Sequence, residues 1–335
     1  DAADGSHLYI TDTNVSNGVH GFYIDSFEVS QLDEWKKDES TLRVLLWNIQ
    51  NGMWADQHNN YDNFVEWVKK WDADVCIWCE SETIYKDKTA TSTSTKYLPD
   101  GWKELCKRYG HSYAAVGGNR DNYPQTITSK YPITTVQRIT DSNVSGKPIA
   151  HGAGHFTITV NGKKVNIVTL HMWPQQYGFG VASANRDESE AKFEGDLYRV
   201  FEMQYIVDQT VNNSKYASEE LWLLGGDTNA RSRLDNWYYN YDAASTKLMT
   251  HDILLNQTAL KDVIGHRYPG LFISSTMGSA RIDIMYASPA MYEKLTNSIT
   301  LIDEWLSQTK KSEYHTSFYD RSDHRPLLMD FDMSK

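Results

Sequence analysis

The sequence predicts an α/β (α+β) protein in which two stacked, mixed or antiparallel β-sheets are flanked by helices. Three observations support this fold class. Short apolar runs of strand length recur from Thr41 onward. Segments with helical periodicity fall between some of them. Few runs form tight strand–helix–strand units, which argues against a doubly wound parallel sheet and favours two sheets packed face to face.

Six apolar runs have the length and bounding residues of strands. They are Leu42–Ile49, Asp74–Cys79, Lys164–Leu170, Leu221–Leu224, Arg281–Ala287 and Pro326–Phe331.

Two segments between these runs have the apolar spacing of amphipathic helices. One helix is expected to bury Phe64, Val65, Val68 and Trp71 on one face. A longer helix is expected to bury Phe193, Leu197, Val200, Phe201 and Tyr205. On that helix Arg199 and Glu202 are interpreted as an exposed or interlayer ion pair.

Residues 1–40 are mixed in character, and we expect them to form an extension to a main domain over residues 41–335. Within them, Val19–Val29 has the character of a short strand and Gln31–Lys37 that of a helical turn. The sequence begins at Asp1 without Met, which we interpret as a processed or trimmed end. The Asn- and Tyr-rich composition is compatible with a secreted, periplasmic or cell-surface protein.

The charge balance limits the classes of partner. Lys and Arg total 33 against 44 Asp and Glu, a formal net charge of −11. We therefore expect no stable nucleic-acid complex, because such complexes need a broad basic surface. No run approaches the roughly 20 apolar residues of a membrane span. The three cysteines, Cys76, Cys79 and Cys106, form no disulfide framework, and the two of the C-x-x-C pair, Cys76 and Cys79, are expected to be buried core thiols.

Polar residues stand at or just beyond the apolar runs. Asn48, Glu80 and His171 follow three of them directly. The other positions are Asp227 and Asn229 after Leu221–Leu224, Asp283 within the run from Arg281, and Asp323 and His324 before the last run. An Asp or Asn after a strand is usually a turn former. Because packed strands end at a shared rim, however, so many such residues together predict one site there.

The residue types at this rim fit one chemistry. Hard oxygen ligands such as Glu80 and Asp323 suit Mg²⁺ or Mn²⁺, with Ca²⁺ as a further option. A divalent cation neutralises the charge that grows on a phosphoryl group during in-line attack. A His324–Asp283 pair would orient the imidazole and stabilise its protonated form. Zinc and serine-nucleophile chemistry have no support, since neither H-E-x-x-H nor G-x-S-x-G occurs.

From about Leu42 to Phe331 the motifs resemble those of the endonuclease/exonuclease/phosphatase superfamily, which has the deoxyribonuclease-I-like fold. The resemblance rests on six motifs in matching order and spacing. They are Trp47-Asn48-Ile49-Gln50 with Gly52, the strand ending in Glu80, Leu170-His171, Gly225-Gly226-Asp227-Thr228-Asn229, Arg281-Ile282-Asp283 and Ser322-Asp323-His324-Arg325-Pro326. The resemblance implies a four-layered α/β sandwich and a catalytic domain over residues 41–335.

The resemblance also implies roles for the residues at the rim. Glu80 is the main metal ligand, with Asn48 and Asp323 nearby. His324, paired with Asp283, is the general base or a histidine that contacts the phosphate. Asp227 and Asn229 orient the water and the phosphate, and the choice between Asp227 and His324 as proton acceptor stays open. His171 stabilises the phosphate or the leaving group.

Several loop residues near these motifs are candidates for contact with substrate through stacking or charge. They are Trp54, His58, Tyr123, His155, Trp173, Arg231 and Trp237. The segment 175–195 is interpreted as either a substrate-shaping loop or surface decoration.

The leading hypothesis is a metal-dependent hydrolase of phosphodiesters or phosphomonoesters that uses an activated water and acts as a monomer. Its substrate is a nucleic acid, a lipid head group, or a small sugar or inositol phosphate. A metal-dependent nuclease is one alternative, and a non-catalytic glycan-binding module on the same fold is another.

Overall fold

The computed structural model describes residues 37–334 except 58–59, 83–98, 120–121 and 303–321. The strand expected over Val19–Val29 and most of the turn expected over Gln31–Lys37 lie outside these residues. The division at residue 40 therefore stays a prediction.

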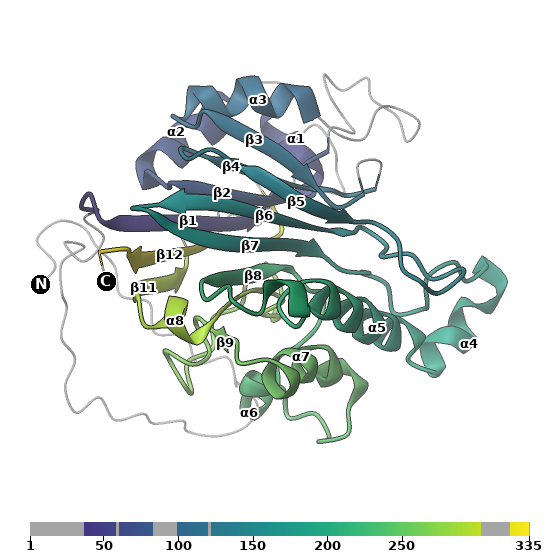
Figure 1. Cartoon of the computed structure of the whole chain (residues 1–335). Helices are drawn as coiled ribbons and strands as arrows, with labels where there is room; N and C mark the ends of the chain where they lie inside the picture. The colour runs from purple at the N-terminus through teal and green to yellow at the C-terminus, as the bar shows by residue number, and fades with distance from the viewer. Residues whose placement is uncertain (1–36, 58–59, 83–98, 120–121, 303–321, 335) are drawn as a thin grey trace, which may run out of the picture. The chain divides into compact units, whose positions relative to one another are not determined.

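Two six-stranded mixed sheets form the framework of this part of the chain (Figure 1). The first has the order β11-β12-β1-β2-β4-β3, with bounds Leu295–Thr300, Leu327–Asp332, Thr41–Asn48, Val75–Cys79, Gln125–Ser129 and Tyr113–Gly117. The second has the order β5-β6-β7-β8-β10-β9, with bounds Thr134–Ile139, Ala153–Val160, Lys163–His171, Trp222–Asp227, Asp283–Ala287 and Lys261–Asp262. Of the described strand pairs, β1–β2 and β7–β8 are parallel and the others antiparallel.

The main core lies where the two sheets meet. Alternate residues of β1 (Leu42, Val44 and Leu46) are fully buried in one cluster with Ile167 of β7 and Leu223 of β8. The predicted apolar runs form strands because each central strand is covered on both faces, so almost every position is apolar or buried. The predicted two-sheet sandwich is thus confirmed.

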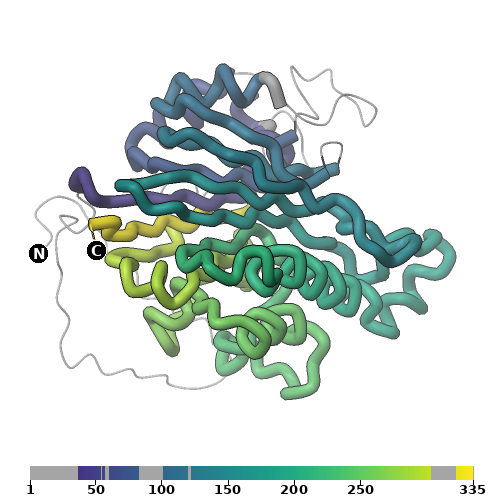
Figure 2. Tube along the Cα trace, viewed as in Figure 1, coloured from purple at the N-terminus to yellow at the C-terminus, as the bar shows by residue number. Residues whose placement is uncertain are grey.

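Helices cover the outer faces of both sheets (Figure 1, Figure 2). On the first sheet these are α2 (Asp62–Trp71) and α3 (Pro99–Arg108), and on the second α5 (Glu194–Gln209) and α7 (Thr246–Gln257). The remaining helical segments are α1 (Gln50–Gln57), η3 (Ser183–Asn185), α4 (Arg186–Ala191), η4 (Ser214–Tyr216), η5 (Arg233–Asp235), α6 (Asn236–Tyr239) and α8 (Pro289–Tyr292). Among the described residues, no helix is both long and apolar enough to serve as a transmembrane span.

The buried faces of two helices differ from expectation. On α2, Trp67 is buried with Phe64, Val65 and Val68, whereas Trp71 is only partly buried. On α5 the predicted face was wrong at Phe193 and Leu197, which are 53% and 46% exposed, whereas Val200, Phe201 and Tyr205 are partly buried against the core. That helix instead buries residues that include Met203, Ile206 and Val207. The apolar pattern misled because α5 also buries charged side chains that bond to neighbouring loops.

The Arg199–Glu202 pairing was also wrong. Arg199 pairs with Asp196 and donates to the carbonyl oxygens of Trp173 and Gln175. Glu202 instead accepts from two backbone N–H groups elsewhere. Cys76 and Cys79 are free and buried, as predicted, and Cys106 is also free and buried.

Candidate active site

The polar residues predicted at the rim do converge at one end of the two sheets. Asn48 ends β1, and Glu80 directly follows the parallel strand β2. His171 ends β7 and stands opposite Asp227, which ends the parallel strand β8. Asp283 opens the antiparallel strand β10 and pairs with Asp227 from the other side. Each sheet thus contributes side chains on rigid supports to the same place.

Asp227 is the centre of this group. Its Oδ2 accepts a hydrogen bond from Asn48 Nδ2 at 2.9 Å. The same oxygen lies 3.7 Å from His171 Nε2 and 3.8 Å from His324 Nε2. Asn48 Nδ2 also donates to Glu80 Oε1 at 3.0 Å, so one amide joins carboxylates that belong to different sheets. This arrangement requires the sheets to be packed together.

His324 is held by Asp283. Their Nδ1 and Oδ2 atoms are 2.7 Å apart, and Ser275 Oγ donates to the same Asp283 oxygen at 2.8 Å. Burial alone would lower the pKa of His324, but the charges of Asp283 and Asp227 raise it well above its usual value. Burial raises the pKa of Asp283 to about 6, against the opposing charge of His324. We infer that the proton of this coupled pair stays on the imidazole at neutral pH.

Glu80 has the surroundings of a ligand to a divalent cation. Its Oε1 accepts from Asn48 and its Oε2 from the Asn51 N–H at 3.1 Å. Burial raises its pKa and nearby Asp323 raises it further, while His171 opposes the shift. Glu80, His171 and Asp227 offer ligand atoms within 4.8 Å of one another. Crowded, desolvated carboxylates fit a bound divalent cation, because the cation would neutralise them.

The remaining predicted site residues occupy defined positions around this group. Asn229 has a φ of 49°, donates from its backbone N–H to Asp227 Oδ1 and donates from Nδ2 to the Met172 carbonyl. The Asn48 oxygen proposed as a metal ligand accepts from the Gln50 N–H at 3.0 Å. Asp323 acts electrostatically on both Glu80 and His324.

Sequence reasoning missed His151, which lies against His171. Their ring centroids are 4.4 Å apart and the planes are tilted by 31°. Burial, together with the charge of His171, holds the pKa of His151 well below its usual value. The available signal was a histidine just before β6, but only the structure shows that the loop containing it returns to the end of β7.

Sequence reasoning assigned Glu202 of α5 to an ion pair and missed its contacts with the loops beside the site. Its Oε1 accepts from the Ala150 N–H at 2.7 Å, and its Oε2 accepts from the Trp173 N–H at 2.9 Å. One buried carboxylate therefore joins the residue before His151 to the loop that follows His171. Burial raises the pKa of Glu202 to about 7, against the two N–H groups and Arg199.

The loop candidates for substrate contact differ in where they lie. Tyr123 and Trp173 lie near His171 and His151, since Tyr123 contacts both rings and Trp173 contacts His151. Arg231 lies two residues beyond Asn229, and its buried Nε has no hydrogen-bond partner. Trp237 lies on α6 with 56% exposure. His58 and the side chain of Trp54 fall outside the described residues.

The prediction for His155 was wrong. It lies within β6 and is fully buried, its Nε2 is 2.9 Å from Asn166 Oδ1, and its ring contacts Trp222 at the start of β8. Asp227 ends the same strand. His155 is therefore a core residue away from the site. It is buried because it lies within β6, a strand whose residues are almost all buried.

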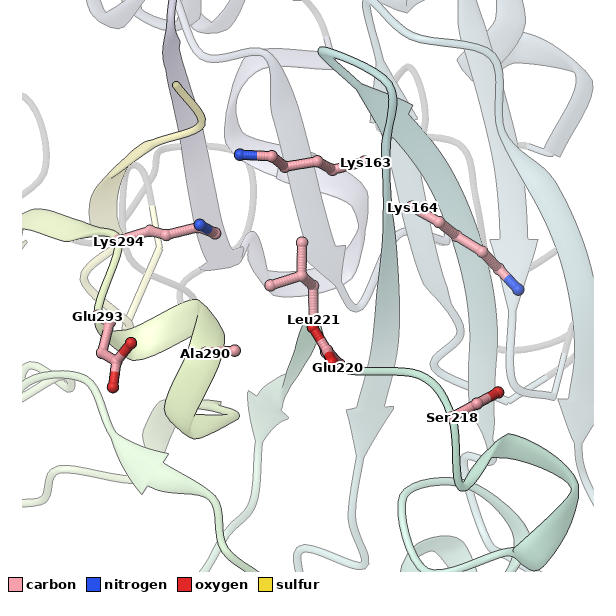
Figure 3. A pocket seen from close by; sticks show the side chains of 8 residues that line it. All are labelled: Lys163, Lys164, Ser218, Glu220, Leu221, Ala290, Glu293 and Lys294. Carbon is pink, nitrogen blue, oxygen red and sulfur yellow. The ribbon is translucent and has the colours of Figure 1, made fainter. Parts of the chain in front are cut away.

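A cavity of about 370 Å³ lies at the opposite ends of β7 and β8 (Figure 3). Its charged lining residues include Lys163, Lys164 and Lys294 together with Glu220 and Glu293. These charges nearly balance, so the cavity has no strong preference for an anion.

The fold is similar to that of solved nuclease and phosphatase structures, in agreement with the α/β sandwich that the resemblance implied. An AP endonuclease from Archaeoglobus fulgidus matches with a TM-score of 0.58 and 15% identity, covering 87% of this chain and 99% of that chain. The 3′ phosphatase NExo from Neisseria, bound to a product DNA hairpin, matches with a TM-score of 0.55, 14% identity and coverages of 87% and 99%. An endonuclease/exonuclease/phosphatase from Beutenbergia cavernae matches with a TM-score of 0.54, 16% identity and coverages of 88% and 72%. No protein-family profile and no curated protein sequence matches the chain.

Proposed function

We propose that this protein is a divalent-metal-dependent phosphoesterase that hydrolyses a phosphodiester or phosphomonoester by in-line attack of water. The observation that carries the proposal is the position of Asp227, which lies between two histidines and is joined to Glu80 through Asn48. A carboxylate with a purely structural role on the surface is solvated by water and does not need two histidines and a second carboxylate beside it. Phosphoryl transfer, in contrast, requires a proton acceptor, cationic hydrogen-bond donors and a metal ligand in one place.

The roles follow from the contacts and charges. Asp227 would accept a proton from the attacking water, since His324 already holds one through its pairing with Asp283. His324 and His171 would donate to phosphoryl or leaving-group oxygens as negative charge develops there. The amide of Asn229 would complete this ring of donors. Glu80, with Asp323 and Asn48, would hold Mg²⁺ or Mn²⁺, which neutralises phosphoryl charge when bound.

The residues of the site favour a phosphate ester, and the fold and the charge of the protein bear on the substrate class within phosphate esters. The AP endonuclease and the DNA-bound 3′ phosphatase share the fold and favour a nuclease as the alternative. The net charge of −11 favours a small or transiently bound phosphate ester over a tightly held nucleic acid. We therefore place a small phosphoester ahead of a nuclease, with lipid head groups as a third substrate class and a monomer as the acting form.

The direct test is hydrolysis of bis-p-nitrophenyl phosphate and p-nitrophenyl phosphate with Mg²⁺ or Mn²⁺ and then with chelator. We expect turnover that disappears with chelator and in Glu80→Ala, but persists in Glu66→Ala, a matched change at an exposed ion pair with Lys69. Plasmid DNA, sphingomyelin and inositol phosphates separate the substrate classes. Absence of turnover on all of these substrates would contradict the proposal.

A further inference from the structure

His151 and His171 are two imidazole rings in contact, tilted by 31°, and each is hydrogen-bonded to the backbone in the same way. His151 Nδ1 lies 3.2 Å from the Asn122 carbonyl oxygen, and His171 Nδ1 lies 3.2 Å from the Tyr123 carbonyl oxygen. The two carbonyls belong to consecutive residues, joined at Tyr123 with its left-handed φ of 49°. Because a carbonyl oxygen only accepts, each Nδ1 must carry the hydrogen.

This attachment determines the direction of the other ring nitrogens. In an imidazole, Nε2 lies on the far side of the ring from the Nδ1–H bond. Two rings 4.4 Å apart that donate to adjacent carbonyls therefore direct both Nε2 atoms away from the 122–123 backbone. His171 Nε2 lies 3.7 Å from Asp227 Oδ2, so that direction leads into the proposed active site.

The Nε2 atom of His151 is a buried acceptor without a hydrogen-bond partner, on a side chain that is only 2% exposed. Burial and the neighbouring His171 both disfavour a second proton on this ring. A neutral Nε2 presents a lone pair, which repels an anionic phosphoryl oxygen. It would be satisfied by an O–H donor, and an unsatisfied buried acceptor is costly enough to make that contact matter.

We propose that His151 Nε2 accepts a hydrogen bond from a substrate hydroxyl on the carbon adjacent to the esterified oxygen. The preferred substrates would then be phosphate esters of vicinal diols, as in sugar, polyol or ribonucleoside phosphates. This inference rests on the proposed function and narrows it, because His171, whose ring lies against that of His151, would contact the phosphoryl or leaving-group oxygen beside that hydroxyl.

The surroundings of His151 hold the acceptor in place. Glu202 fixes the preceding residue through the Ala150 N–H. The His151 carbonyl accepts from the Asn119 N–H at 2.8 Å and from Gln125 Nε2 at 3.3 Å. Gly152, with a φ of 74°, packs so closely against Gly118 that a Cβ there would lie 2.7 Å from the Gly118 Cα. A rigidly supported acceptor discriminates between ligands better than a mobile one.

The test compares two esters that differ only in one hydroxyl: the phosphate monoester of trans-1,2-cyclohexanediol and cyclohexyl phosphate. If the protein cleaves only diesters, their p-nitrophenyl diesters replace them. We expect wild-type kcat/KM to favour the hydroxylated ester about tenfold, the scale of one well-placed hydrogen bond. In His151→Phe, which keeps an aromatic ring against His171 but removes the acceptor, this ratio should fall to about one.

His155→Phe is the matched control, since His155 is a buried histidine away from the site, and it should keep the wild-type ratio. A wild-type ratio near one, or an unchanged ratio in His151→Phe, would overturn the inference even though esters are hydrolysed. If His151→Phe does not fold, the ratio of kcat/KM for the two esters in the wild-type protein alone tests the inference. If neither ester is cleaved while the substrates listed above are, calorimetric Kd values for the two esters test the acceptor. The proposed function fails only if none of these substrates is cleaved.

Discussion

His324 Nδ1 lies 2.7 Å from Asp283 Oδ2, and this contact determines which member of the site carries a proton. An imidazole paired in this way keeps its hydrogen on Nδ1 and presents Nε2 toward Asp227. Burial works against a charged histidine, yet two carboxylates hold the pKa of His324 well above its usual value. The pair therefore supplies a cationic donor beside an anionic acceptor.

Replacing Asp283 with Asn should lower the pKa of His324. The change removes a contacting negative charge while it keeps a side chain of similar size, and such charges shift a pKa by roughly 1 to 3. Two-dimensional NMR of the imidazole resonances across a pH titration measures the effect directly. Asp252→Asn, at an ion pair with Arg233, is the matched control. An unchanged pKa in Asp283→Asn would show that Asp283 does not hold the proton on His324.

Replacing His324 with Ala should lower kcat by about 10²-fold or more, the usual scale for a general acid–base group. The reason is the loss of the proton donor that faces Asp227 and the phosphoryl site. Steady-state kinetics on the best substrate found above provide the measurement. His266→Ala, at an exposed histidine, should leave kcat near the wild-type value. Full activity in His324→Ala would remove His324 from the mechanism.

Mn²⁺ should stabilise the wild-type protein against thermal unfolding. A ligand that binds only the folded state contributes about 2.7 kcal/mol at one hundred times its Kd. Glu80→Ala should lose most of this effect because the carboxylate that would hold the cation is gone. Differential scanning calorimetry with increasing Mn²⁺ gives the comparison without any substrate. Superimposable metal titrations of the two proteins would mean that Glu80 is not a ligand.

Glu202→Gln should change how stability depends on pH. The pKa of Glu202 is raised to about 7, so between pH 4.5 and 7 the folded state binds its proton more tightly than the unfolded state. Wild-type stability from this group therefore falls as pH rises through that window, by roughly 3 kcal/mol. The variant lacks this pH-dependent contribution to stability, because a glutamine side chain does not titrate. Urea unfolding of both proteins at pH 5 and pH 8 should show a smaller wild-type advantage at pH 8.

The result that would contradict this assignment is a difference between wild type and Glu202→Gln that is the same at both pH values. Glu188→Gln, at an exposed helical pair with Lys192, supplies the control and should follow wild type throughout.

Much of the fold could be predicted from the sequence because buried strands require continuous apolar runs. The six runs became β1, β2, β7, β8, β10 and β12 with small shifts at their ends. Partly exposed strands such as β3 and β5 carry no such run and were not identified. The buried face of α5 was mispredicted because Arg199 and Glu202 are buried through loop contacts that no local pattern encodes.

The convergence of Glu80, Asp227 and His324 was predictable because each stands at the end or the start of a strand. The residues that contact them from other elements were harder to predict from the sequence. His151 reaches the site only through the path of the chain between β5 and β6, and Glu202 through the packing of α5. Both contacts depend on tertiary structure. His155 shows the converse, since a histidine in a predicted loop proved to be part of a buried strand.

The position of β12 has a consequence for how the protein is made. This strand, the last one described, lies between β1 and β11 in the first sheet, and the segment just before it contributes Asp323 and His324. During synthesis, the edge of β1 that pairs with β12 therefore stays unpaired until almost the whole domain has been made. Hydrolytic activity would therefore require synthesis to pass β12, and until then the unpaired edge of β1 would be open to pairing with another chain.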